Sequence, residues 1–243
     1  MRINGKTALV TGGNDGIGIE IARHLRSGGA TVIVAGRDAT RLAAARIEGF
    51  EATAADLSTV AGCDALIEAI AGHPIDMLVN NAGMGADYDV TPQTPEPIDL
   101  DTVDRCIFLN LNAPIRLITG LLDTLQARPE AMIVNVTSGL AIAPRAASPV
   151  YCATKAALRS FTMALRAQLE GTKVHVLEAL PPVVETRMTA GNTHRKMSAS
   201  ECGRQIVAAI AANKRQANIG LTALLNAVYT VSPPLARRVM LRY

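Results

Sequence analysis

A glycine-rich turn near the start of the chain, Thr11 to Gly18, constrains the fold more than any other segment. The apolar, β-branched run before it, Thr7-Ala-Leu-Val-Thr11, predicts a buried parallel strand. Apolar residues then recur at helical spacing until Gly28, which predicts a helix. Glycines between a strand and a helix let the backbone approach a phosphate, which the free amide groups of the helix N-terminus attract. The segment therefore predicts a nucleotide-binding turn, and an ordinary glycine-rich turn is the alternative.

Strand and helix signals alternate along the chain. Strands are predicted near 7–11, 31–35, 50–54, 77–80, 131–137 and 174–179, with helical patterns between them. This alternation implies a parallel sheet covered on both faces through right-handed crossovers. No repeat or linker divides the 243 residues. We therefore expect one doubly wound α/β domain over residues 1–243, with a parallel sheet of about seven strands and helices on both faces.

A second motif, Tyr151-Cys-Ala-Thr-Lys155, places a phenol one helical turn before an ammonium group. Ser148-Pro149 predicts an N-cap followed by proline at the first helical position, so both side chains project from one face. Free tyrosine has a pKa of about 10. A neighbouring ammonium lowers that pKa, which suits a group that cycles between acid and base. A surface tyrosine and lysine that share a turn by chance are the alternative.

Together these motifs resemble the short-chain dehydrogenase/reductase family, in its Thr-Gly-x-x-x-Gly-x-Gly and Tyr-x-x-x-Lys form. The other matches follow in the family's order: Asp56-Leu57 after the third strand, Asn80-Asn81-Ala82-Gly83 after the fourth, Asn110 within Leu109–Ala113, and Ser138 thirteen residues before Tyr151. The resemblance covers nearly the whole chain. It implies a Rossmann-type fold and hydride transfer between the nicotinamide of NAD(P) and a carbonyl or alcohol carbon.

The resemblance also implies residue roles. Tyr151 would be the general acid/base, Ser138 would hydrogen-bond the substrate oxygen, and Lys155 would both lower the pKa of Tyr151 and hold the nicotinamide ribose. Asn110 would hold a water that relays protons to the lysine. The cofactor-binding residues implied are Gly12, Asn14, Asp15, Gly16, Ile17, Gly18, Arg37, Asp56, Leu57, Asn81, Ala82, Gly83, Tyr151, Lys155, Pro181, Val184 and Thr186.

The residues around Asn110 add a physical argument. Pro114 lies four residues later and cannot donate the hydrogen bond that the carbonyl of Asn110 would receive in a regular helix. That carbonyl would then be free to hold a water. A kink that serves packing alone is the alternative.

The end of the second predicted strand favours NADP over NAD. An acidic side chain there would bind the ribose 2′-hydroxyl of NAD, but this chain has Gly36 followed by Arg37. A guanidinium can pair with the 2′-phosphate of NADP. Asp15 points the other way, because members of the resembled family that use NADP often have a basic residue at that position.

The chain departs from the resembled family in two places. Pro181-Pro182 stands where Pro-Gly is usual, and the C-terminus lacks the usual Asp-Gly-Gly ending. The second departure leaves a homotetramer, a homodimer and a monomer open.

Composition excludes several other classes of protein. The four cysteines, Cys63, Cys106, Cys152 and Cys202, form no Cys-x-x-Cys pair, and no secretory signal is seen, which favours a cytoplasmic protein. The four histidines show no metal-ligand spacing, so no metal is expected. A net charge of +3 is too small to favour nucleic acid. The uncharged segment 217–236 holds too many polar residues and prolines for a membrane span. A last strand plus an apolar helix is favoured over contact with a membrane surface, so no membrane partner is expected.

We therefore expect an NADP-dependent oxidoreductase acting on a small carbonyl or alcohol. Leu140 and Ile142, from a loop expected at residues 139–145, and Met188 and Met197, from one expected at residues 188–197, suggest a largely apolar substrate. A third such loop is expected at residues 84–99. Two alternatives stay open: a non-catalytic cofactor-binding sensor or scaffold of the same fold, and a dehydratase or epimerase built on the same site.

Overall fold

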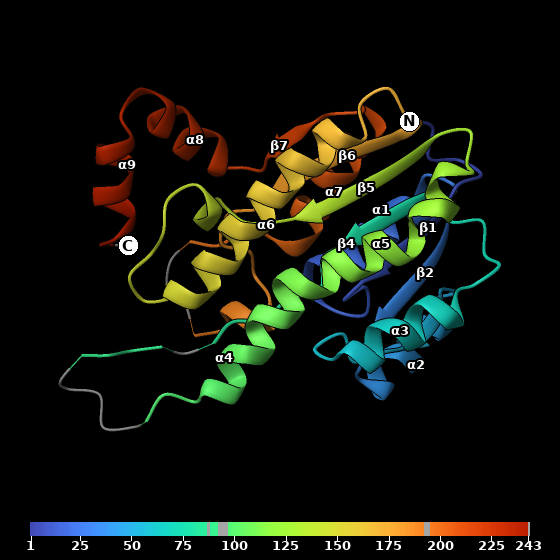
Figure 1. Ribbon diagram of the computed structural model, residues 1–243, viewed down its shortest axis with the longest axis horizontal. Coiled ribbons are helices and arrows are strands. Elements are labelled where there is room, and N and C mark those ends of the chain that lie inside the picture. The colour runs from blue at the N-terminus through green and yellow to red at the C-terminus, as the bar shows by residue number, and fades with distance from the viewer. Residues whose placement is uncertain (87, 92–96, 192–194, 243) are drawn as a thin grey trace.

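The fold is built around one central β-sheet. A computed structural model describes residues 1–86, 88–91, 97–191 and 195–242. Within these residues seven strands form one parallel sheet in the order β3-β2-β1-β4-β5-β6-β7 (Figure 1). They are β1 (Thr7–Thr11), β2 (Thr31–Gly36), β3 (Glu51–Ala54), β4 (Met77–Asn80), β5 (Ala131–Val136), β6 (Val174–Leu180) and β7 (Gln216–Asn218).

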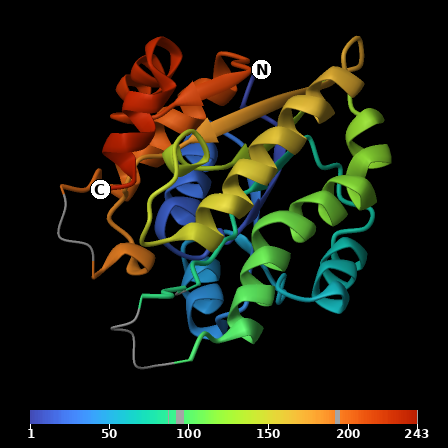
Figure 2. The same ribbon diagram turned by 60° about the vertical axis from the view of Figure 1, so that its left-hand side comes forward.

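Helices cover both faces of this sheet. They are α1 (Gly16–Ser27), α2 (Ala39–Ile47), α3 (Val60–Ala69), α4 (Leu100–Ile107), α5 (Ala113–Gln126), α6 (Pro149–Gln168), α7 (Ala199–Ala211), α8 (Thr222–Val231) and α9 (Pro233–Met240). Short turns η1 (Phe108–Asn112), η2 (Gly139–Ala141) and η3 (Arg187–Thr189) lie between them. The segment α4-η1-α5 runs beside α6 on one face (Figure 2).

The alternation of side chains along the strands produces two cores. Ala8 and Val10 of β1 pack with α1, α2 and α7 on one face of the sheet, whereas Leu9 packs with α3, α5 and α6 on the other. Successive strand residues point to opposite faces, and here both faces are buried. The predicted doubly wound α/β fold is confirmed.

The element bounds differ from the prediction by one residue or so. The third strand begins at Glu51, because the N–H of Phe50 still closes α2 by donating to Ala45. Ser148 does precede Pro149 at the start of α6, but its hydroxyl accepts a hydrogen bond from Arg145 at 2.7 Å and does not cap the helix.

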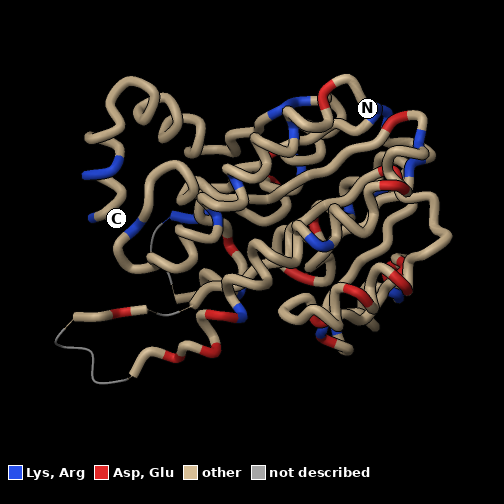
Figure 3. The backbone as a smooth tube through the Cα atoms, viewed as in Figure 1, with Lys and Arg blue, Asp and Glu red and all other residues tan. Residues whose placement is uncertain are grey.

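The C-terminal region forms β7, α8 and α9, in line with the expected last strand and apolar helix. Figure 3 shows basic and acidic residues interspersed over the sheet and its helices, whereas α9 carries Arg237 and Arg238 without an acidic residue and α8 carries no charged residue. Among the described residues, one helical segment, Leu100–Gln126, is long and apolar enough to span a membrane by length and composition alone. Its residues Leu117, Leu121 and Leu125 are buried against the sheet, as in a core helix.

Candidate active site

A cavity of about 650 Å³ opens at the carboxyl ends of the strands, where the strand order reverses between β1 and β4. Doubly wound sheets bind ligands at this switch point. The cavity is lined by most of the residues that the sequence singled out: Gly12, Asn14, Asp15, Gly16, Ile17, Arg37, Asp56, Leu57, Asn81, Ala82, Gly83, Ser138, Tyr151, Lys155, Pro181, Val184 and Thr186. Gly18 and Asn110 do not line the cavity themselves but lie next to residues that do.

The glycine turn approaches its neighbours too closely for side chains. Gly12 has φ +61°, and a Cβ there would lie 3.0 Å from the Cα of Ala82. A Cβ on Gly18 would overlap the carbonyl oxygen of Gly12 and approach Asn81 Nδ2 to 2.5 Å. Gly18 therefore lets α1 start directly against the turn. The amide groups at the start of α1 are thereby directed at the cavity.

Asp15 is the N-cap of α1. Its Oδ1 accepts the backbone N–H of Gly16 at 2.9 Å, and an N-cap carboxylate also favours the positive end of the helix dipole. No acidic residue follows in the first turn of α1. Asp15 therefore places a carboxylate at this helix end, and the way its charge is balanced affects what the turn can bind.

Tyr151, Lys155 and Ser138 meet at one end of the cavity. The Lys155 Nζ lies 5.8 Å from the centre of the Tyr151 ring and donates to the Val136 carbonyl at 2.9 Å. Ser138 follows β5, and its Oγ accepts the N–H of Leu140 at 3.1 Å. Both Ser138 and Lys155 are buried. The helix α6 and the end of β5 therefore bring the three side chains together.

Burial governs the proton affinities of this group. Burial raises the pKa of Tyr151 to about 12, and a hydrogen bond with Ser138 opposes that shift. Burial likewise lowers the pKa of Lys155 from 10.5 to about 8. The expected lowering of the Tyr151 pKa does not occur in this structure, because desolvation of the phenol outweighs the opposing effects of Ser138 and Arg145. Tyr151 is therefore a neutral phenol at neutral pH.

Asn110 lies in a π turn, η1, at the point where Pro114 cannot donate a helical hydrogen bond. Its side chain is held by several partners. Nδ2 donates to the Met84 carbonyl at 2.8 Å and to Thr154 Oγ1 at 3.0 Å, and Oδ1 accepts the N–H of Met84 at 2.9 Å. A Cβ on Gly83 would lie 3.1 Å from Asn110 Oδ1 and 3.5 Å from Lys155 Nζ. Asn110 is thus fixed close behind the lysine.

The opposite end of the cavity is rich in arginine. Arg37 follows β2 and is exposed, and Arg41 on α2 pairs with Asp38 at 3.1 Å and with Asp15 at 3.7 Å. Arg187 of η3 donates through Nε to Asp15 at 2.8 Å. Sequence reasoning identified Arg37 and Asp15 but missed Arg41 and Arg187. Arg41 could have been found from its position one helical turn after the N-cap Asp38, whereas Arg187 reaches Asp15 only through the fold.

The loops expected around the substrate contribute unequally. Met84 and Gly85 from residues 84–99 and Met188 line the cavity, together with Leu109. Leu140 and Ile142 instead line a separate groove beside α9. Met197 packs against the core on the face of the sheet that α1 and α7 cover. Part of two of these loops, residues 87, 92–96 and 192–194, lies outside the described residues.

The four cysteines are buried and unpaired. Within the described residues no group of three or more His, Cys, Asp or Glu side chains is placed to hold a metal ion.

Comparison with known proteins places this geometry in a family. The short chain dehydrogenase family profile matches residues 6–197. An uncharacterized oxidoreductase of Bacillus subtilis (strain 168), DltE, is 41% identical over 212 residues, which are 83% of this chain and 82% of that protein.

Solved structures share the fold. A short chain dehydrogenase from Burkholderia cenocepacia J2315 in complex with NADP has a TM-score of 0.86 and 22% identity, over 99% of both chains. A 3-ketoacyl-(acyl-carrier-protein) reductase from Brucella melitensis complexed with NADH has a TM-score of 0.78 and 29% identity, over 88% of this chain and 96% of that one. The cofactors of these structures differ. The chain belongs to the short-chain dehydrogenase/reductase family and is an NAD(P)-dependent oxidoreductase.

Proposed function

We propose that the protein transfers a hydride between NADP(H) and the carbonyl or alcohol carbon of a small, largely apolar molecule, with Tyr151 as the general acid/base. The observation that carries the proposal is the layout of one cavity. Tyr151, Ser138 and Lys155 lie at one end, and Arg37 and Arg41 lie at the other. A cavity of this size suits an extended dinucleotide with a small substrate beside it.

The residues present fit such a cofactor. The glycine turn leaves room for a diphosphate at the start of α1, and side chains there would fill the cradle. Lys155 would hold the nicotinamide ribose, and Pro181, Val184 and Thr186 would lie along the nicotinamide. Asp56 and Leu57, after β3, would flank the adenine. When bound, the nicotinamide supplies or accepts the hydride, and the protein is left to position the substrate and manage one proton.

Tyr151 suits the proton transfer of the reductive direction. With a pKa of about 12 it keeps its proton at neutral pH and can donate it to the oxygen of a carbonyl. Ser138 would hold that oxygen. Asn110, whose side chain is fully engaged, would offer its backbone carbonyl to a water that returns the proton through Lys155.

The choice of NADP rests on the arginines. Asp15 argued for NAD, but Arg187 and Arg41 both pair with it, so its charge is offset within the cavity. Arg37 and Arg41 lie beside the carboxylates of Asp38 and Asp56 at this end of the cavity. Arg37, directly after β2, is placed to pair with a 2′-phosphate.

The cofactor assignment is tested by binding. Arg37→Ala should weaken NADPH binding by about 1.5–3 kcal/mol, the range for a charged hydrogen-bond partner, and leave NADH binding little changed. Titration that follows the fluorescence of the reduced nicotinamide, or calorimetry, measures both constants. Wild-type protein that binds NADH as tightly as NADPH would show that the NADP assignment is wrong.

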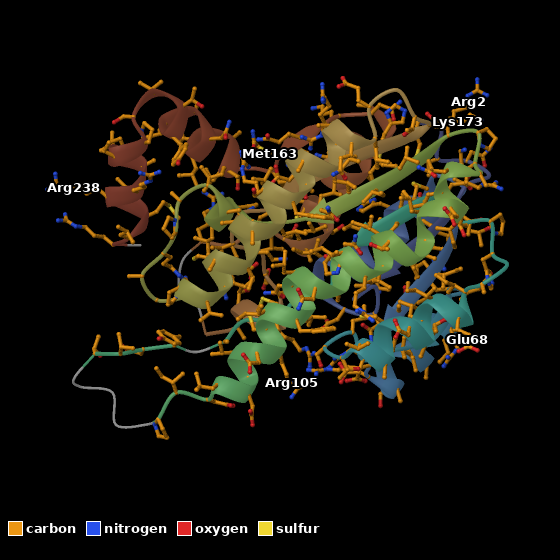
Figure 4. The ribbon with its side chains drawn as sticks, in the orientation of Figure 1. Arg2, Glu68, Arg105, Met163, Lys173 and Arg238 are labelled. Carbon is orange, nitrogen blue, oxygen red and sulfur yellow. The ribbon has the colours of Figure 1, made fainter. Side chains whose placement is uncertain are left out.

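We also propose that residues 1–243 form a single cofactor-binding domain, that the protein lies in the cytoplasm and that it forms a homodimer or homotetramer. Met163 on α6 and Leu224 on α8 are exposed apolar side chains that subunit contacts would cover, and Met163 points outward in Figure 4. Light scattering measures the assembly.

A further inference from the structure

Arg187 joins two segments that are far apart in the sequence, across the mouth of the cavity. Its Nε donates to Asp15 Oδ2 at 2.8 Å, over a separation of 172 residues. Asp15 lies in the glycine turn before α1, and Arg187 begins η3 after β6. Both residues line the cavity.

A second contact brings the same two segments together. A Cβ on Gly16 would lie 3.1 Å from Thr186 Cγ2, so the backbone of the turn lies close to the residue before Arg187. The segment of Arg187 is itself anchored, because the N–H of Glu185 donates to the Met197 carbonyl at 2.8 Å and Lys196 Nζ donates to the Thr189 carbonyl at 2.6 Å. The backbone therefore holds Arg187 in place, and only its side chain needs to move to change partner.

The ion pair itself is weak enough to exchange. The Arg187 side chain is 66% exposed and that of Asp15 is 39% exposed. Exposed ion pairs contribute little to stability, because water screens both charges. Arg41 approaches the same Asp15 oxygen at 3.7 Å, so two guanidinium groups share one carboxylate. A diphosphate offers more acceptor oxygens and more charge than that carboxylate, and a guanidinium binds phosphate oxygens in a bidentate manner.

We propose that Arg187 is a cofactor-binding residue that Asp15 holds across the cavity mouth until the diphosphate of the cofactor replaces the carboxylate. Asp15 then competes with the cofactor, and Arg187 closes over the diphosphate once it is released. The inference rests on the proposed nicotinamide cofactor, but not on the preference for NADP, because NAD and NADP carry the same diphosphate.

The two partners of the pair should have opposite effects on binding. Arg187→Gln should weaken binding of both NADPH and NADH by about 10- to 100-fold, through loss of a charged hydrogen-bond donor. Asp15→Asn keeps a good N-cap but removes the competing charge, so it should tighten binding of both by about two- to fivefold. In the Arg187→Gln background, Asp15→Asn should give little or none of that gain. A structural ion pair would behave differently, since losing either partner would then weaken binding.

Isothermal calorimetry on the full chain measures these constants, with 2′-AMP as a probe that carries the 2′-phosphate without the diphosphate. Arg187→Gln should leave 2′-AMP binding unchanged, whereas Arg37→Ala should weaken it. Arg23 also lies on α1, and Arg23→Ala removes its ion pairs with Glu20 and with Glu48 at the end of α2. This variant is the matched control and should bind all three ligands like the wild-type protein.

Unchanged NADPH and NADH binding in Arg187→Gln, or weaker binding in both single variants, would overturn this inference alone. Failure of the wild-type chain to bind either dinucleotide would overturn the proposed function with it.

Discussion

At the scale of single residues, burial disfavours the charged forms of both Tyr151 and Lys155. The phenol stays protonated at neutral pH, and part of the Lys155 population loses its proton near pH 8. The expectation that the Lys155 ammonium lowers the pKa of Tyr151 ignores burial, because it considers both groups as if they were in water. Inside the protein, the cost of desolvating each charge is the larger effect. A positive charge brought close by a bound oxidised nicotinamide would add to that of Lys155 and favour the phenolate.

The lowered pKa of Lys155 has a measurable consequence for stability. In the unfolded chain the lysine returns to its ordinary pKa of 10.5, whereas in the folded chain the pKa is about 8. Between these values the unfolded state binds more protons, so stability rises with pH. From about pH 7.5 to about pH 9.5, wild type should gain roughly 2 kcal/mol of unfolding free energy relative to Lys155→Met.

Urea unfolding without added nucleotide, at the two pH values, measures this difference. Lys173→Met, at an exposed position at the edge of the molecule (Figure 4), is the matched control and should follow wild type. The same pH response in wild type and Lys155→Met would show that the lysine is not desolvated as described.

Some site residues were visible in the sequence and others were not. Gly12, Tyr151 and Lys155 belong to local motifs, whose spacing is set by one turn or one helix. Arg187 reaches its partner only after β1 and β6 have been placed in the same sheet, so no local pattern marks it. The contacts of Asn110 with Met84 and Thr154 are of the same kind.

At the scale of elements, the start of α1 depends on the absence of a side chain at Gly18. A methyl group there would overlap the carbonyl oxygen of Gly12 and press on the Asn81 amide. Gly18→Ala should therefore push the helix away from the turn, destabilise the fold by about 1–3 kcal/mol and abolish tight nucleotide binding.

Gly85→Ala provides the control. Gly85 also lines the cavity, but a Cβ there would meet nothing within 4 Å. Chemical denaturation and nucleotide titration of both variants measure the difference. Native stability and affinity in Gly18→Ala would contradict the close packing described for the turn.

The π turn η1 forms because of a residue that is close to it in the sequence. Pro114 removes one donor, and the helical segment widens at Asn110 without breaking, since α4 and α5 continue on either side. The sequence left a water-holding carbonyl and a packing kink both open. The geometry fixes where the irregularity lies, while its use in proton relay stays a prediction.

At the scale of the whole molecule, the fold was the easiest part to predict. Strand runs such as 77–79 and 131–134 are apolar throughout because both faces of the sheet are buried, and this signal is independent of the loops. The loops that shape the substrate end were harder, since their side chains can turn either way. Leu140 and Ile142 were expected at the substrate and instead line a groove beside α9.

The cavity joins an arginine-rich end to the end that holds Tyr151. The proposed function requires that a hydride pass from a bound nicotinamide to a substrate beside the tyrosine. A screen of NADPH oxidation with varied carbonyl compounds identifies a substrate that the wild-type protein reduces. Tyr151→Phe keeps the ring, so it should still fold and bind NADPH, while turnover on that substrate should fall by about 10²–10⁴-fold.

The most direct measurement follows the hydride itself. The identified carbonyl compound is incubated with NADPH deuterated at the transferred position of nicotinamide C4, and the product is analysed by mass spectrometry and NMR. The wild-type protein should place one deuterium on the new alcohol carbon for each NADPH oxidised, and Tyr151→Phe should do so far more slowly. NADPH oxidation without deuterium in the product, or labelling at an undiminished rate in Tyr151→Phe, would contradict the account.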